Sequence, residues 1–437
     1  MTNCNTQLSL FSGFKSRKIH FDFNGGDITS DAGGMLLRAA DQKLSLTKNL
    51  ASLLNDSRRQ KSCEHKHLHL LRQRIYGIAL GYEDLNDHGT LRKDPAFQTF
   101  IDNDKDLAHP STLCRLENRA DEQTAWLINS LIIDLFIRSK KTPPDELILD
   151  FDATDDPVHG QQEGRFFHGY YDHYCFLPLY VFCGSQLLVS YLRPSRIDPA
   201  KHAWAILSLL VKRFRAKWPN VKIIFRGDSG FCRWKMFRWC DAHNVGYIVG
   251  LAKNTRINNI ADSYIKKAEK EFNRTGTKQR LFASVKYGAL TWDKERRVIV
   301  KAEHSNMGSN PRYVVTNLKE DPQHLYDEIY CARGDMENRI KEQQMDMFSD
   351  RTSCHKWWPN QLRLLFSSLT YILVETIRRV GLKATDLAKA QCRTIRLKLF
   401  KIGAAVIRNT RKIYFHCSSA YPYQNLFNLI AKRLAIE

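Results

Sequence analysis

Three acidic side chains stand where carboxylates could gather around metal ions. Asp152 ends the apolar run "ELILDFD", Asp228 follows the run "VKIIFRG", and Glu337 lies in the stretch "YCARGDMENRIKEQQ". Apolar strands rarely end in an unpaired charge near the core, so such carboxylates are a moderately strong signal. Ligand sets made only of oxygen favour Mg²⁺ or Mn²⁺ over Zn²⁺. Two such ions about 4 Å apart hold the attacking and the leaving oxygen of a phosphoryl transfer, which is the chemistry that these residues indicate.

Each carboxylate also has an ordinary structural interpretation. Asp152 and Asp228 could serve as turn or cap residues for the chain that follows them. On a helix, Arg333, Glu337 and Lys341 would share one face as a ladder of exposed ion pairs, each worth a few tenths of a kcal/mol. The three carboxylates taken together, in a chain of high positive charge, favour the metal site.

A mixed sheet flanked by helices would position these carboxylates. Strand-like apolar runs occupy 146–152, 175–184, 186–194, 221–228 and 245–251, and helical patterns occupy 200–218 and 231–244. Three strands joined by short links indicate an antiparallel meander, and the strand–helix alternation after them indicates parallel additions. The first and fourth strands would then be neighbours, and the helix that carries Glu337 could pack across them.

The composition points to a polyanionic partner. The chain has 437 residues, enough for two or three domains, and its 67 Lys and Arg against 46 Asp and Glu give a net charge of +21. Nucleic acid is the natural partner for such a charge, and an anionic membrane surface is the weaker alternative. No apolar run approaches the roughly 20 residues of a membrane span, and the first residues lack the apolar core of a signal peptide.

The cysteines and histidines give a weaker signal. Eleven cysteines are scattered without a C-x-x-C pair, which is typical of reduced thiols in a cytoplasmic protein. The cluster "CEHKHLH", with Cys63, His65 and His69, could suggest zinc, but no second ligand pair follows at the spacing of a zinc finger. A helix whose histidines face solvent or phosphate is the favoured interpretation.

The first 140 residues have helical patterns. Ser111 and Thr112 would cap a short helix that projects Arg115 and Arg119. A helix, a turn and a capped helix match both a helix that reads a DNA groove and a plain helical bundle. The segment "RSKKTPPDE" that follows is basic and then broken by prolines, which predicts a domain boundary.

Three motifs together resemble a known family. They are "LDFDATD" around Asp152, "FRGDSGF" around Asp228, and the pattern Y-x-x-R-x-x-x-E formed by Tyr330, Arg333 and Glu337. The chain resembles the DDE transposases of bacterial insertion sequences, whose catalytic fold is ribonuclease-H-like, and is similar to the insertion-sequence "thirteen-eighty" family among them. Stretches such as "TSDAGGMLLR" and "STLCRLEN" extend the resemblance over nearly the whole chain.

The resemblance implies roles for these residues. Asp152, Asp228 and Glu337 would be both catalytic and metal-binding, with two Mg²⁺ ions for which Mn²⁺ would substitute. Tyr330 and Arg333 would contact DNA near the cleaved bond. Because converging carboxylates repel one another, we expect a raised pKa for at least one of them.

One position departs from the family pattern. Relatives commonly have lysine seven residues after the glutamate, where this chain has Gln344. Lys341, one turn earlier, is therefore a candidate DNA contact, in addition to Arg115 and Arg119 of the N-terminal helix.

The implied function is that of a DNA transposase. It would bind the terminal inverted repeats of its element, cleave the strands and join them to target DNA in cut-and-paste transposition. Its partner would be double-stranded DNA, its working form a homodimer on DNA, and its location the bacterial cytoplasm and nucleoid, with no membrane. The alternatives are a ribonuclease-H-fold DNA nuclease and a DNA-binding regulator derived from a transposase.

The expected architecture is α/β, with a ribonuclease-H-like mixed sheet flanked by helices. Five segments are expected: a helical DNA-binding and end-recognition domain at 1–140, a first part of the catalytic core at 141–251, a β-rich insertion at 252–323, a second part of the core with the Glu337 helix at 324–385, and a basic C-terminal region at 386–437.

Overall fold

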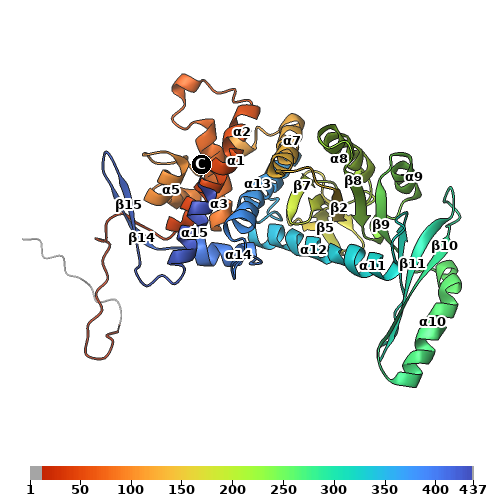
Figure 1. Ribbon diagram of the computed structural model, residues 1–437. Coiled ribbons are helices and arrows are strands. Elements are labelled where there is room, and N and C mark those ends of the chain that lie inside the picture. The colour runs from red at the N-terminus through yellow and green to blue at the C-terminus, as the bar shows by residue number, and fades with distance from the viewer. Residues whose placement is uncertain (1–11, 436–437) are drawn as a thin grey trace, which may run out of the picture. The chain divides into compact units, whose positions relative to one another are not determined.

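A computed structural model describes residues 12–435 (Figure 1). The chain divides into two compact units, each discontinuous in sequence. The sheet unit consists of Leu44–Ser57 and Cys114–Glu375. The terminal unit combines the chain up to Lys43, Arg58–Leu113 and the chain from Thr376.

The sheet unit contains, among the described residues, a mixed sheet of nine strands. Eight of them follow the order β10-β11-β13-β9-β8-β2-β6-β7, and β12 pairs with β11. The strands are β2 (Glu146–Ala153), β6 (Leu179–Cys183), β7 (Gln186–Tyr191), β8 (Lys222–Gly227), β9 (Gly246–Leu251), β10 (Gln279–Tyr287), β11 (Arg296–Ser305), β12 (Gly308–Ser309) and β13 (Arg312–Thr316).

The central pairings confirm the mixed α/β class. β2 pairs with β8 in parallel, β8 pairs with β9 in parallel, and β2 pairs with β6 antiparallel. The first and fourth predicted strands, β2 and β8, are therefore neighbours, as the sequence indicated. The three strands expected as a β-rich insertion are also present, but they extend this sheet beyond β9, because β13 pairs antiparallel with β9.

Helices cover both faces of the sheet (Figure 1). Those of this unit are α2 (Leu46–Leu53), α6 (Pro110–Glu117, which begins in the terminal unit), α7 (Glu122–Ser139), α8 (Ala203–Lys217), α9 (Trp234–Ala242), α10 (Thr255–Thr275), α11 (Pro322–His324), α12 (Gly334–Lys341) and α13 (Trp357–Thr376). Leu149 and Phe151 belong to a core shared with α7, α8, α9 and α10. Ile224 and Ile248 point to the opposite face, where Leu325 packs.

The boundary expected at residue 140 does not separate the two units. Ile133 and Phe136 of α7 are buried in the same core as Leu149 and Phe151 of β2. This burial assigns α7 to the sheet unit, although the sequence analysis placed it in the N-terminal helical segment.

The segment that carries the Y-x-x-R-x-x-x-E motif is helical but irregular. Between α11 and α12 lie a π-helical turn at Leu325–Tyr330 and a 3₁₀ turn at Cys331–Arg333, and a second π-helical turn at Glu342–Asp346 follows α12. Tyr330, Arg333 and Glu337 thus stand in three different kinds of helical turn, whereas one regular helix was expected. Such π-helical turns are frequent at functional sites.

A second sheet of three short strands follows β2. Its order is β3 (Asp156–Pro157), β5 (His173–Phe176), β4 (Phe166–His168). The apolar run at 175–184 predicted a single strand. The chain instead divides at Pro178, which lacks the N–H that a continuous strand would use, and β5 and β6 enter different sheets.

The terminal unit joins segments from distant parts of the chain. Its helices are α1 (Met35–Leu44), α3 (His67–Leu80), α4 (His88–Leu91), α5 (Pro95–Ile101), α14 (Cys392–Ile395) and α15 (Gln424–Leu434). Its sheet has the order β1 (Ile28–Thr29), β14 (Ala404–Arg408), β15 (Ile413–Cys417). β14 and β15 form a hairpin, in which Arg408 pairs with Ile413 across the turn.

In the described part of the chain, none of the helices has the length and apolar character that a membrane span requires.

Candidate active site

Two of the three predicted carboxylates stand at the ends of adjacent parallel strands. Phe151 of β2 pairs in register with Gly227 of β8, so Asp152 and Asp228 are the next residues on the two strands. Asp228 also caps the turn that follows it, because its Oδ1 accepts a hydrogen bond from the Gly230 N–H at 2.9 Å. The cap interpretation and the strand-end interpretation of Asp228 therefore hold together.

A buried ion pair lies two residues before these carboxylates. Asp150 and Arg226 face each other across β2 and β8, with Oδ2 and Nη2 2.6 Å apart and Nε in contact with Oδ1. Only 1% of Asp150 and 6% of Arg226 is exposed. Arg226 also donates through Nη1 to the carbonyl of Ile329, the residue before Tyr330. The pair thus ties both strand ends to the helical segment that carries the motif.

The Asp150–Arg226 ion pair was not predicted from the sequence, although the sequence contains a signal for it. Asp150 and Arg226 are charged residues inside apolar runs, where a charge needs a partner. Burial raises the pKa of Asp150 and the Arg226 guanidinium opposes that rise. The charged pair is therefore costly to bury, which is typical of groups kept for position rather than for stability.

Arg333 bridges the first and third predicted carboxylates. Its Nη1 lies 3.1 Å from Asp152 Oδ2 and its Nη2 lies 2.5 Å from Glu337 Oε1. The i,i+4 pair with Glu337 is the ion ladder considered above, and the contact with Asp152 goes beyond it. The side chains of Asp152 and Arg333 are largely buried, at 16% and 18% exposed, whereas that of Glu337 is 45% exposed.

The pKa of Asp152 is raised to about 7. Burial is the largest cause, Arg333 opposes it, and the negative charges of Asp228 and Glu337 add to the rise. The raised pKa expected from the convergence of carboxylates is present, but repulsion is the smaller contribution. Asp228 and Glu337 are therefore both close enough to Asp152 for their charges to act on it.

Tyr330 lies beside the turn that Asp228 begins. A Cβ built on Gly250 of β9 would be 2.6 Å from the Tyr330 hydroxyl and 2.9 Å from the Ser229 nitrogen. The Tyr330 hydroxyl therefore occupies space that a side chain at position 250 would fill. Gly250 is a functional position that the sequence motifs do not include, although a glycine inside an apolar strand signals the close approach of another group.

The remaining predicted residues lie outside this group. Lys341 is exposed at the end of α12, and Gln344, at the position of the family lysine, donates through Nε2 to the Asp155 carbonyl at 2.9 Å. Arg115 is exposed on α6. The helix was expected to carry Arg119 as well, but it ends at Glu117, and Arg119 is exposed in the turn that follows, with its Nη1 3.3 Å from Asp56 Oδ1.

The donor set suits a hard divalent ion by its chemistry. Asp152, Asp228 and Glu337 offer only carboxylate oxygens, the ligands that Mg²⁺ and Mn²⁺ prefer. As the described residues are placed, no group of three or more His, Cys, Asp or Glu side chains is arranged to hold a metal ion, and this includes the Cys63, His65 and His69 cluster. The guanidinium of Arg333 instead carries the positive charge between Asp152 and Glu337.

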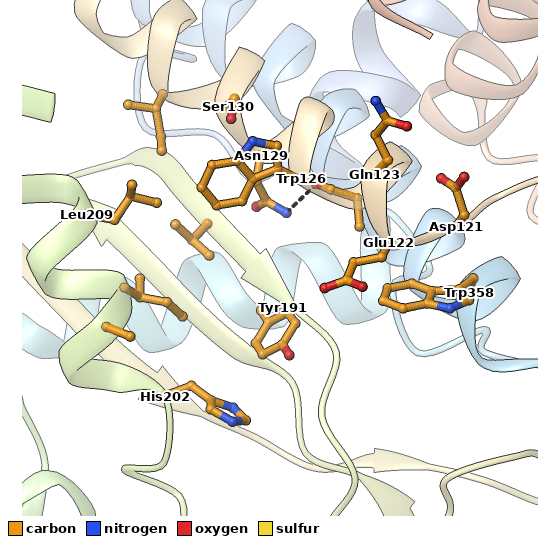
Figure 2. A pocket seen from close by; sticks show the side chains of 15 residues that line it. Asp121, Glu122, Gln123, Trp126, Asn129, Ser130, Tyr191, His202, Leu209 and Trp358 are labelled. Atoms are coloured by element: carbon orange, nitrogen blue, oxygen red, sulfur yellow. Dashed lines mark hydrogen bonds between the residues drawn. The ribbon is translucent and has the colours of Figure 1, made fainter. Parts of the chain in front are cut away.

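A separate cavity of about 930 Å³ has a different character (Figure 2). Its lining comes from α7, α8, β7 and α13 and includes Asp121, Glu122, Trp126, Tyr191, His202 and Trp358. None of the predicted site residues lines it. Two acidic side chains among apolar and aromatic ones repel phosphate, so this cavity does not suit a nucleic-acid backbone.

Comparison with known proteins gives one family. A family model described as "Transposase DDE domain group 1" matches residues 11–436. The cryo-EM structure of a piggyBac transposase synaptic complex with hairpin DNA is similar to this chain, with 13% sequence identity, a TM-score of 0.43, and coverage of 85% of this chain and 80% of that chain. No curated protein matches the sequence.

Proposed function

The chain belongs to the group 1 family of transposase DDE domains, and from this membership we propose that it is a cut-and-paste DNA transposase. It would bind the terminal inverted repeats of its element, cleave DNA strands there and join the freed ends to target DNA. The insertion-sequence "thirteen-eighty" group is the branch to which we assign it, on the strength of the Tyr330, Arg333 and Glu337 motif.

The observation that carries this proposal is the convergence of three carboxylates from distant parts of the chain. Asp152 and Asp228 stand at neighbouring strand ends, and Arg333 connects Asp152 to Glu337. In the strand order β7-β6-β2-β8-β9, β6 is antiparallel to both of its neighbours, and β2, β8 and β9 are parallel to one another, which supports a ribonuclease-H-like catalytic core. In such a core, function depends on the carboxylates at the strand ends, not on the fold alone.

We assign the metal-binding role to Asp152, Asp228 and Glu337, with two Mg²⁺ ions and Mn²⁺ as a substitute. The ions would stabilise the charge that develops on the attacking and leaving oxygens of the phosphodiester. The chain itself contributes position: the Asp150–Arg226 pair holds both strand ends, and Gly250 leaves room for Tyr330. With the ions bound, Arg333 and Tyr330 would contact the phosphates beside the cleaved bond, for which a forked guanidinium is suited.

Binding to DNA would involve other parts of the chain as well. The net charge of +21 supports a polyanionic partner. Arg115, Arg119 and Lys341 are exposed and are the candidate contacts outside the carboxylate site. Two element ends have to be held together for excision, so a homodimer on DNA is the proposed working form.

The test is cleavage of DNA that carries the ends of the chain's own element. Asp152→Asn, Asp228→Asn and Glu337→Gln should each abolish Mg²⁺-dependent cleavage while DNA binding and the melting temperature are retained. Glu328→Gln, an exposed neutralisation on the same helical segment, is the matched control and should cleave normally.

The outcomes separate the alternatives. Cleavage without joining would favour a nuclease, and binding to the ends without cleavage in Mg²⁺ or Mn²⁺ would favour a regulator. A well-folded variant that cleaves at the wild-type rate would remove the substituted residue from the site.

A further inference from the structure

The hairpin formed by β4 and β5 exposes large aromatic side chains. The exposed fractions are 52% for Phe167, 86% for Tyr170 and 47% for Tyr174. Single exposed aromatic residues are ordinary, but three within eight residues form a patch that calls for a partner.

Three of the side chains in this patch contact one another on or beside the strands, and Tyr170 lies in the turn that joins β4 to β5. Phe167 and Tyr174 pair across the two strands, with ring centroids 5.7 Å apart. The guanidinium of Arg165 lies over the ring of Tyr174, 4.3 Å from its centroid. We call Arg165, Phe167, Tyr170 and Tyr174 the aromatic face.

The opposite side of the hairpin is anchored in the protein. Cys175, the residue after Tyr174, is fully buried. Because side chains alternate along a strand, the side of β5 that carries Cys175 faces the protein, and Tyr174 with its partner Phe167 is on the other side. Phe176, the last residue of β5, is also fully buried, and its ring lies 5.4 Å from that of Trp357. The hairpin is therefore anchored by buried residues outside the aromatic face.

The hairpin is also joined to the candidate active site. Its sheet begins with β3, a few residues after Asp152 on the same chain segment. His173 Nε2 lies 2.9 Å from Asp155 Oδ2, and Gln344 donates to the Asp155 carbonyl at 2.9 Å. Tyr171, next to Tyr170, has its pKa raised to about 12 by burial and then by the charges of Asp155 and Asp152. The tip of the hairpin is thus close to the first carboxylate.

We propose that the aromatic face stacks unpaired nucleobases of the DNA strand that passes the carboxylates. Aromatic rings accept any base, since every base has a π-face, and an arginine beside them adds cation–π attraction and a phosphate contact. The combination of rings with Arg165, in a chain of charge +21, suits a polyanion with planar bases better than an apolar protein surface. This inference rests on the proposed function, because it takes DNA as the substrate.

The test is binding by the full chain without divalent metal. Two probes share one sequence: a blunt duplex, and a duplex with a single-stranded overhang that carries 2-aminopurine next to the junction. Wild-type protein should quench the 2-aminopurine and bind the overhang more tightly than the blunt duplex. Tyr170→Ala and Phe167→Ala should lose the quenching and about tenfold in overhang affinity, with blunt-duplex affinity unchanged. Tyr170→Trp should retain both.

The control removes an exposed tyrosine elsewhere. Tyr414→Ala, at 42% exposure on β15, should change neither probe. Equal losses on both probes, or no loss on either, would overturn the inference. A change of oligomeric state in sedimentation without an overhang-specific loss would also overturn it, and would assign the face to a second copy of the chain.

Failure here is distinct from failure of the proposed function. If the variants lose affinity only for the overhang probe but the wild-type protein never cleaves DNA, the proposed role of the aromatic face stands and the transposase activity is rejected. Cleavage that depends on Asp152, with variants of the aromatic face binding normally, would reject only the aromatic face.

Discussion

Asp156 is a buried carboxyl whose ionisation opposes folding. It is 1% exposed in β3. Burial raises its pKa well above the ordinary value of 3.8, the Thr352 hydroxyl offsets a part, and Asp350 and Asp155 raise it further. A carboxyl with a raised folded-state pKa stabilises the protein fully below the unfolded pKa, and this contribution is lost as the pH rises toward the folded pKa.

Asp156→Asn should therefore stabilise the protein at neutral pH. We expect the free energy of unfolding at pH 7 to increase by about 1–3 kcal/mol. As the pH rises above 4, this free energy should fall less in the variant than in the wild-type protein. Urea unfolding measured from pH 4.5 to 8 checks both. Glu269→Gln, an exposed neutralisation on α10, should leave the pH dependence as it is. A variant that is less stable than wild type at pH 7 would contradict the expectation that the charge of Asp156 opposes folding.

At individual positions, the sequence predicted which carboxylates would meet but not what lies between them. Asp152 and Asp228 could be placed because a strand end is visible in an apolar run. The bridge that Arg333 makes depends on the distance between a strand and a helix after packing, which no local pattern encodes. The pairing of Asp150 with Arg226 likewise needs the register of β2 and β8, which is set across 76 residues of chain.

β9 supports the motif segment through Gly250, and this contact can be tested. Gly250→Ala puts a Cβ at 2.6 Å from the Tyr330 hydroxyl and 2.9 Å from the Ser229 nitrogen, so both must shift. We expect a stability loss of about 1–3 kcal/mol and a cleavage rate lowered about 100-fold, since small misplacements at a site are costly. Thermal melting and single-turnover cleavage measure the two effects.

A second substitution tests whether contact between the new Cβ and the Tyr330 hydroxyl causes the stability loss of Gly250→Ala. Adding Tyr330→Phe to Gly250→Ala removes the closest contact and should recover part of the lost stability. Gly288→Ala, where the nearest neighbour is at an ordinary 3.4 Å, is the control and should stay close to wild type. If the double variant is no more stable than Gly250→Ala alone, the hydroxyl is not the source of the strain.

Among the elements, the central strands could be predicted from the pattern and length of their apolar runs. The division at Pro178 and the pairing of β13 with β9 could not, because both depend on contacts between distant parts of the chain. Pro178 was visible in the sequence, yet only the two sheets show that the chain divides there. β13 pairs with β9 through contacts such as Thr316 with Ile248. A strand pattern does not specify its neighbour, so a separate insertion and an extended sheet look alike in sequence. The π-helical turns around Tyr330 follow from packing and carry no propensity signal.

The terminal unit depends on the meeting of segments almost 370 residues apart. Gly33, near the start of the chain, lies against the backbone of Leu399 and Phe400. A Cβ on Gly33 would be 1.8 Å from the Leu399 carbonyl oxygen and 2.6 Å from the Phe400 Cα. Gly33→Ala should therefore destabilise this unit by about 3 kcal/mol. Hydrogen exchange followed by mass spectrometry should show faster exchange in Arg58–Leu113 and Ala404–Arg408, with the sheet unit unchanged.

Gly89→Ala is the matched control within the same unit. A Cβ at Gly89 meets nothing within 4 Å, so this helical exchange should be neutral or slightly stabilising. Uniformly faster exchange in both units after Gly33→Ala would show that they unfold as one body. Consecutive segments were the natural expectation from the sequence, because composition does not reveal which distant pieces share a core.

The pairing of β1 with β14 also sets an order for synthesis. The ribosome completes every segment of the sheet unit by Glu375, whereas the partner of Ile28–Thr29 first emerges at Ala404–Arg408. Domains fold as units while the chain is made. The carboxylate-bearing unit can therefore fold on the ribosome, while the early residues of the terminal unit wait until Ala404–Arg408 have been made. A chain on which translation stops before Ala404 keeps all three carboxylates and leaves β1 without its partner.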